Sequence, residues 1–156
     1  MKLRVAAVAS FLICAMLVTT NPALSFGRDD EWTSGWGQGV AEAIVTHGPG
    51  NQIYVTCNDG GSPYSATEIN FTLGGDSSKD NSITLTFDGD EPKQFMLSHG
   101  SITSDCHACM SNYLFVIDKF KTKNKVHVLF ESGVGTSFTL KGAKNAISQC
   151  TPDFAR

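Results

Sequence analysis

Alternation of apolar and polar residues along most of the chain constrains its fold more than any other feature of the sequence. Every second residue is apolar in four segments, namely residues 53–57, 68–73, 82–88 and 126–130. Successive side chains of a strand point to opposite faces, so this period of two indicates strands with one buried face and one face in water. Turn-forming residues separate the segments. The chain is therefore predicted to be mainly β, with an antiparallel sheet of the β-sandwich type.

Shorter apolar segments at residues 40–46, 95–97 and 137–140 extend the predicted sheet. Between the predicted strands, residues 74–81 and 100–105 are polar and are expected to be loops. Residues 26–39 are polar and rich in glycine, which argues against a helix there. Within them, Trp32 is expected to anchor the N-terminal segment onto the core, because burial stabilises a large indole ring. A tryptophan that stacks on a ligand is the alternative for this position.

The period changes after residue 105, where one longer helix is predicted. Its apolar face consists of residues at helical spacing, namely Cys109, Tyr113, Val116, Ile117 and Phe120. A strand is the alternative, since β-branched and aromatic residues are frequent in this segment. Ser104 or Asp105 is expected to cap the helix, because their side-chain oxygens accept free amide protons of a first turn. Residues 119–125 contain four lysines and are expected to be a solvated connection.

A second, short helix is predicted near the end of the chain. Gly142 begins it, and its apolar residues fall on one face: Ala143, Ala146, Ile147 and Cys150. The predicted architecture is thus a single β-rich domain with one longer and one short α-helix.

The first 25 residues have the three regions of a secretory signal peptide. A basic head at residues 1–4 precedes an apolar run of about fourteen residues, and a polar tail ends in Ala23-Leu24-Ser25. A transmembrane helix needs about 20 apolar residues, so a retained membrane anchor is the less favoured alternative. Cleavage after Ser25 would leave residues 26–156 as one exported domain without an integral membrane span.

Export changes the meaning of the cysteines, because thiols form disulfides in oxidising compartments. Cys14 would leave with the signal peptide, and four cysteines would remain: Cys57, Cys106, Cys109 and Cys150. Four cysteines permit three pairings. We favour a local bond between Cys106 and Cys109, and a long-range bond from Cys57 to Cys150 that closes a loop of about 94 residues. The predicted domain is therefore held together by two disulfides.

The segment Cys106-His107-Ala108-Cys109 is the sharpest candidate for chemistry. The dipole of a helix stabilises a thiolate at the helix N-terminus. Cys106 would then be the nucleophile, and Cys109 the resolving thiol, of a thiol–disulfide oxidoreductase. A polar segment precedes the motif, however, where the usual redox fold has a buried parallel strand and a βαβ unit.

Two other roles are open to the same segment. A metal site could draw on Cys106, His107, Cys109, His99 and His127, but the chain has no second Cys-x-x-Cys and no paired histidines at zinc spacing, so no metal or other cofactor is expected. Alternatively, a disulfide-bonded turn could present His99 or His107 to a protein partner, because pre-ordering reduces the entropy cost of binding. A hydrolase inhibitor or an immunity-type protein would use the loop from His99 to Cys109 in this way.

The last third of the exported domain resembles a known family. The segments Lys125-Val126-His127-Val128-Leu129-Phe130 and Ser137-Phe138-Thr139-Leu140-Lys141-Gly142-Ala143, followed by Ala146-Ile147, are similar to the C-terminal half of small exported bacterial proteins of the invasion-associated locus B type. The resemblance implies an exported β-rich domain with an envelope or host-associated role, and it carries over no catalytic residue. The Cys-His-Ala-Cys segment and the Trp-Gly-rich start lie outside it.

These features together favour a non-catalytic binding protein of the bacterial envelope, periplasmic or secreted, that contributes to host interaction or virulence. Loss of Lys2 and Arg4 with the signal peptide would leave a formal net charge of about −5. Nucleic-acid-binding domains usually carry a basic face, so nucleic acid is not an expected partner. A protein partner is expected. The oxidoreductase and the hydrolase inhibitor are the alternatives.

Overall fold

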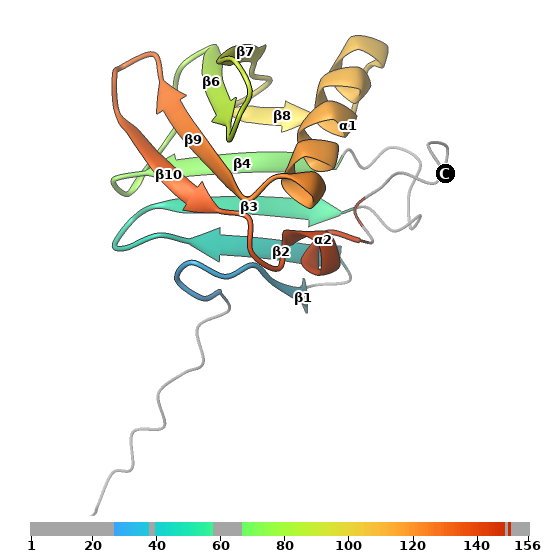
Figure 1. Ribbon diagram of the computed structural model, residues 1–156. Coiled ribbons are helices and arrows are strands. Elements are labelled where there is room, and N and C mark those ends of the chain that lie inside the picture. Colours follow the sequence, from blue (N-terminus) through green and yellow to red (C-terminus); the bar gives the residue numbers. More distant parts are fainter. Residues whose placement is uncertain (1–26, 38–39, 58–66, 149, 151–156) are drawn as a thin grey trace, which may run out of the picture.

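The computed structural model describes residues 27–37, 40–57, 67–148 and 150, and the predicted signal peptide lies outside these residues. Two antiparallel sheets form the domain (Figure 1). The six-stranded sheet has the order β1 (Thr33–Gly37), β2 (Val40–Thr46), β3 (Gln52–Cys57), β4 (Glu68–Leu73), β5 (Asp76–Ser77), and β8 (Ser101–Thr103) also pairs with β4. The four-stranded sheet has the order β10 (Gly135–Thr139), β9 (Lys125–Phe130), β6 (Ser82–Phe87), β7 (Lys93–Met96).

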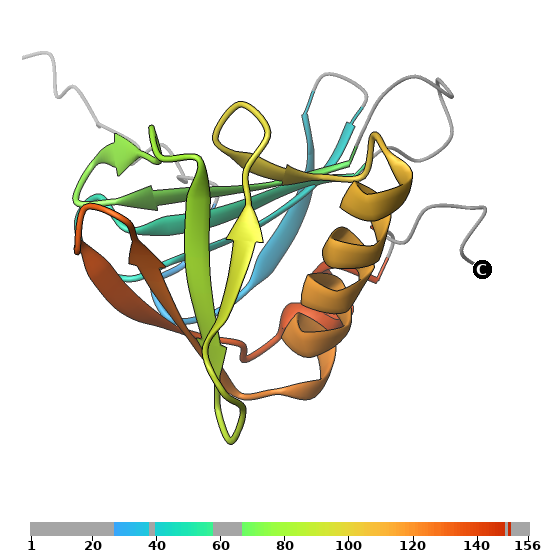
Figure 2. The ribbon, with the colours of Figure 1, turned by 90° about the horizontal axis from the view of Figure 1, so that it is seen from above.

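Two helices complete the fold. The longer helix α1 (His107–Thr122) runs along one side of the two facing sheets (Figure 2), and the short helix α2 (Ala143–Ala146) follows β10. The predicted mainly β, antiparallel single domain with one longer and one short helix is confirmed. The strand alternative for the longer helix is wrong.

The buried faces of the strands are those that the alternation indicates. In β3 the buried residues are Ile53, Val55 and Cys57, and the residues between them are only partly buried. Val55 pairs with Ile69 of β4, which also has its apolar residues inward. Residues Tyr113, Val116, Ile117 and Phe120 of α1 close this core. The strands and the helix thus share one core, because each element buries its apolar face against the others.

Three strands occur where the sequence indicated none. Residues 100–105 were expected to be a loop, but Ser101, Ile102 and Thr103 are buried and form β8. Ile102 pairs with Ile69, and the Ser101 hydroxyl donates a hydrogen bond to Asn70 Oδ1 over 2.6 Å. Pairing with β4 therefore satisfies the hydrogen-bonding groups of these polar residues, which in the sequence alone indicate a solvent-exposed loop. The short β5 and the glycine-containing edge strand β1 likewise depend on pairing with neighbouring strands.

Trp32 anchors the N-terminal segment, as predicted. Its side chain is 4% exposed and packs on the ring of Phe120, with the ring centroids 5.3 Å apart. The indole Nε1 donates to the carbonyl of Thr139 over 3.1 Å, and the backbone N–H of Trp32 donates to the carbonyl of Lys141 over 3.0 Å. Residues just before β1 are thereby held against the end of β10, and the ligand-stacking alternative for Trp32 does not apply.

The lysine-rich segment is only in part a solvated connection, because Thr122, Asn124 and Lys125 are exposed but two of the lysines are paired. Helix α1 continues to Thr122, and Lys119 and Lys123 both reach Asp90 in the turn between β6 and β7, with N···O distances of 2.7 and 2.6 Å. The preceding Asp88 accepts hydrogen bonds from the backbone N–H groups of Asn124 and Lys125. The C-terminal end of α1 is therefore fixed to the four-stranded sheet by polar contacts. The sequence did not reveal them because the acidic and basic residues lie about thirty positions apart.

These contacts predict a loss of stability in acid. A hydrogen bond from the backbone N–H of Lys125 holds the pKa of Asp88 below its usual 3.8. Hydrogen bonds from the side chains of Lys119 and Lys123 hold the pKa of Asp90 below the same value. The folded chain thus binds fewer protons than the unfolded chain. The stabilisation is complete above about pH 5 and is lost as the pH falls through the lowered pKa values. Asp88→Asn should cost up to about 1 kcal/mol at pH 7, measured by urea unfolding, and its difference from wild type should shrink as the pH falls below about 4.

The matched control for this experiment is Asp76→Asn, at an exposed aspartate of β5. A difference between Asp88→Asn and wild type that stays constant from pH 7 to pH 2 would show that the Asp88 charge does not carry the effect.

Candidate functional site

The Cys106–Cys109 disulfide lies at the N-terminus of α1 and is the centre of the candidate site. Its two Cα atoms are 4.9 Å apart. Cys106 is the N-cap of the helix, and its Sγ accepts a hydrogen bond from the backbone N–H of Cys109 over 3.1 Å. Cys106 is exposed, whereas Cys109 is half-buried. We call the four residues from Cys106 to Cys109 the clip.

Neither of the predicted capping residues caps the helix. The Ser104 hydroxyl accepts hydrogen bonds from the backbone N–H and the hydroxyl of Thr67, over 3.0 and 2.7 Å. Asp105 Oδ1 accepts from the hydroxyl of Thr103 over 2.6 Å. Both side chains are therefore engaged by other residues, Ser104 by Thr67 just before β4 and Asp105 by Thr103 of β8, and the sulfur of Cys106 takes the capping position. These contacts also fix the clip to the end of β8.

Two grooves flank the clip. A groove of about 240 Å³ lies between the β7–β8 connection and α1 and is lined by Met96, Leu97, Ser98, Ile102, Thr103, Ala108, Cys109 and Asn112. The other groove, of about 260 Å³, is lined by Ser104, Asp105, Cys106, His107 and Met110. Met96 is 70% exposed, the highest value among the exposed large apolar residues of the described chain. We call the residues that line the two grooves the clip surface.

The structure places only one of the two predicted histidines on the clip surface. His107 is the first residue of α1, is exposed and lines the second groove. His99 lies in the turn between β7 and β8 in a left-handed conformation, with φ of 51°. Its neighbour Ser98 lines the first groove, but His99 itself does not. The loop from His99 to Cys109 is thus partly β8, a buried strand, and not one continuous exposed segment.

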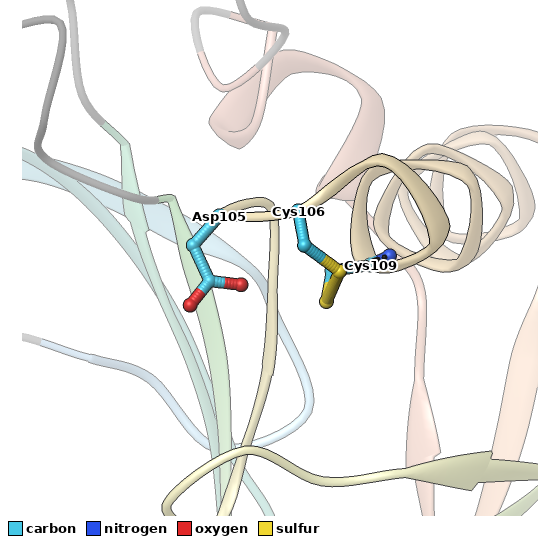
Figure 3. Close-up of side chains that lie close together, drawn as sticks. All are labelled: Asp105, Cys106 and Cys109. Atoms are coloured by element: carbon cyan, nitrogen blue, oxygen red, sulfur yellow. Dashed lines mark hydrogen bonds between the residues drawn. A yellow bond between two sulfur atoms is a disulfide. The ribbon is translucent and has the colours of Figure 1, made fainter.

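A metal site does not fit the clip in its oxidised form. Asp105, Cys106 and Cys109 have potential ligand atoms within 4.8 Å of one another. Figure 3 shows the carboxyl group of Asp105 on the same side as the two sulfur atoms. The sulfur atoms are bonded to each other, however, and a cysteine ligates zinc only as a thiolate. His127 lies on β9, where its Nδ1 is 3.1 Å from the hydroxyl of Ser137.

The second disulfide is structural. Cys57 at the end of β3 and Cys150 after α2 have Cα atoms 4.6 Å apart, and each is 1% exposed. The hydroxyl of Tyr113 donates to the carbonyl of Cys150 over 2.7 Å, and burial raises the pKa of Tyr113 to about 12. Both predicted pairings are confirmed, and the two bonds differ in exposure. Sequence spacing alone could not reveal that difference.

A smaller cavity of about 140 Å³ lies beside this buried disulfide. It is lined by residues of β1, β2 and the α2 region, and Trp36 of β1 is 62% exposed at this place. Of the two tryptophans, Trp36 is therefore the one that is available to solvent.

A family model named YfjT matches residues 30–147. The chain belongs to the YfjT family. No curated protein and no solved structure matches the chain.

The YfjT match extends from before β1 to just after α2, so both sheets and both helices form the family domain. It includes Cys57 and the whole clip and ends three residues before Cys150. Within the described part of this YfjT domain, no helix is long and apolar enough to cross a membrane.

Proposed function

We propose that the protein is a non-catalytic binding protein of the bacterial envelope, exported to the periplasm or the medium, that engages a protein partner through the clip surface. The two disulfides support this location, because such bonds persist in oxidising compartments. The signal-peptide pattern of residues 1–25 points to the same location. A role in host interaction or virulence rests on the resemblance to proteins of the invasion-associated locus B type.

The observation that carries the proposal is the pre-ordered apolar surface on both sides of the clip. The disulfide and the hydrogen bonds of Ser104 hold the turn in one conformation, so little conformational entropy is lost when a partner binds. Met96 and Met110 flank the turn on opposite sides. Methionine side chains adapt to irregular partner surfaces and are frequent at binding sites.

Site-specific photo-crosslinking in intact cells tests the proposal. A photoreactive amino acid replaces Met96 in one variant and Val134 in a control variant, because Val134 is 49% exposed in the β9–β10 turn. We expect a discrete adduct from position 96 that excess unlabelled protein abolishes, and none from position 134. Adducts of equal yield from both positions, or no adduct from position 96, would contradict a partner at the clip surface.

The same experiment separates the inhibitor from other binding proteins. If the adduct from position 96 contains a hydrolase whose activity falls on addition of the purified protein, the partner-binding role is inhibition. A partner without hydrolase activity leaves the protein as a binding protein of another kind.

A further inference from the structure

We propose that the Cys106–Cys109 disulfide undergoes thiol–disulfide exchange with cysteine thiols of an apolar polypeptide segment that lies in the grooves beside it. Cys106 is the sulfur that the incoming thiolate attacks. This inference rests on the proposed function, because it specifies the partner of the clip surface as a cysteine-containing polypeptide.

The different exposure of the two disulfides is the first argument. An attacking thiolate must reach a sulfur atom, and exchange rates depend on this access. Cys57 and Cys150 are each 1% exposed, so their bond is closed to a polypeptide thiol. Cys106 is exposed and Cys109 is half-buried. Of the four disulfide sulfurs, that of Cys106 therefore belongs to the residue most open to solvent.

The position of Cys106 on α1 is the second argument. When the disulfide opens, the Cys106 thiolate is stabilised by the positive end of a 16-residue helix. It also keeps a hydrogen-bond donor in the backbone N–H of Cys109, which is 3.1 Å from Sγ in the disulfide form. A stabilised thiolate is a better leaving group in exchange. The helix terminus therefore favours the reduced clip and makes the disulfide an oxidant.

The grooves are the third argument, and they indicate the class of substrate. They approach the disulfide from both sides, one along Ala108 and Cys109 and the other along Cys106 and His107. Met96, Leu97 and Met110 give them apolar contact area. A small hydrophilic thiol such as glutathione cannot use this area. A polypeptide with apolar residues around its cysteine can bury side chains in both grooves while its thiol reaches Cys106.

The exchange balances without an additional oxidant. A substrate thiolate attacks Cys106 Sγ, a mixed disulfide forms, and the electron pair of the broken bond leaves on Cys109 Sγ, which takes a proton from water. A second substrate thiolate then attacks the substrate sulfur of the mixed disulfide and releases Cys106 as a thiolate. The substrate loses two protons and two electrons and gains a disulfide. The clip gains the two electrons and becomes a dithiol, so each chain reacts once.

The carboxylate of Asp105 slows the exchange, so a substitution at this position gives a second, independent test. A carboxyl oxygen of Asp105 lies within 4.8 Å of the clip sulfurs, and its negative charge repels both the incoming and the leaving thiolate. We expect Asp105→Asn to accelerate exchange about fivefold, monitored by rapid quenching and mass spectrometry. The control is Asp118→Asn, which removes an exposed carboxylate near the other end of the same helix. Equal rates for wild type and Asp105→Asn would contradict this role of the carboxylate.

The decisive experiment uses the purified oxidised protein and a synthetic peptide with two cysteines flanked by leucine and phenylalanine. We expect the clip to be reduced at least tenfold faster by this peptide than by a peptide of the same cysteine spacing in which serine replaces leucine and phenylalanine, while Cys57–Cys150 stays intact in the same mass spectra. The single variants locate the reactive sulfur. Cys109→Ser, which retains Cys106, should form a mixed disulfide with the oxidised peptide at least tenfold faster than Cys106→Ser.

Three outcomes would overturn the exchange: a clip that stays oxidised, equal rates for the apolar and the serine-substituted peptide, or faster reaction of Cys106→Ser. The photo-crosslink from position 96 distinguishes this failure from failure of the proposed function. If that crosslink persists while exchange is absent, the clip is an inert structural bond of a binding surface. If the crosslink is also absent, both proposals fail.

Discussion

Replacement of both Cys57 and Cys150 by alanine is expected to lower the free energy of unfolding by about 4–5 kcal/mol. The bond joins residues 93 positions apart and therefore restricts most of the unfolded chain. In the chain-entropy view, closure of so long a loop removes a large part of the conformational entropy of the unfolded state. Both sulfurs lie in the core, so the alanines also leave a small cavity. For a domain of this size, Tm should fall by about 15 °C.

The Cys106→Ser/Cys109→Ser variant is the matched control for this loss. Its disulfide spans only three positions, and the chain-entropy estimate for so short a loop is about 2 kcal/mol. Serine is itself a good N-cap, so helix capping is largely retained. Urea unfolding of both variants in parallel measures the difference. Equal losses of stability in the two variants would contradict the assignment of the structural role to the buried bond.

The second large effect is expected for Phe120→Ala, which should cost about 3–5 kcal/mol of unfolding free energy. Phe120 is 1% exposed, and its ring centroid lies 5.3 Å from that of Trp32 and 6.0 Å from that of Phe87. The ring therefore joins α1 to β6 and to the N-terminal segment that Trp32 anchors. Its removal leaves a cavity at the meeting point of three elements, which cannot all move inward to fill it.

Phe115→Ala is the control on the same helix. Phe115 is only partly buried, and it packs against Phe95 and under the ammonium group of Lys93, which lies 3.8 Å from its ring centroid. We expect a loss of about 1–2 kcal/mol for this variant, because its site can relax toward solvent. Thermal and urea unfolding measure both variants. A loss for Phe115→Ala as large as that for Phe120→Ala would show that the core does not depend on the ring next to Trp32.

The strand pattern could be inferred from the sequence because it depends on local alternation. A residue such as Val55 or Phe71 is apolar between polar neighbours, and burial of that face against any partner stabilises a strand. The cysteine pairing was a preference among three possibilities that the sequence alone does not decide, and the structure shows the preferred pairs Cys106–Cys109 and Cys57–Cys150.

Strand β8 and the helix cap could not be inferred, because both depend on partners far away in the sequence. Ser101 can be buried because Asn70 accepts a hydrogen bond from its hydroxyl group. Ser104 is unavailable for capping because its hydroxyl group accepts a hydrogen bond from Thr67. The same holds for Lys119 and Lys123, which would be solvated on an isolated helix but reach Asp90 across the fold. In each of these places the polar residues are predicted to be exposed to solvent, because their hydrogen-bond partners cannot be recognised from the sequence.

Local patterns in the sequence are sufficient to predict a mainly antiparallel β domain with a Cys-x-x-Cys motif at the start of its long helix. Only the packed fold shows that Cys106 is exposed, that Cys57 and Cys150 are buried, and that Met96 and Met110 lie on either side of the clip. Periodicity reflects the local burial of one face of each element. Exposure of a given sulfur atom depends instead on how β8, the turn between β7 and β8, and α1 pack together.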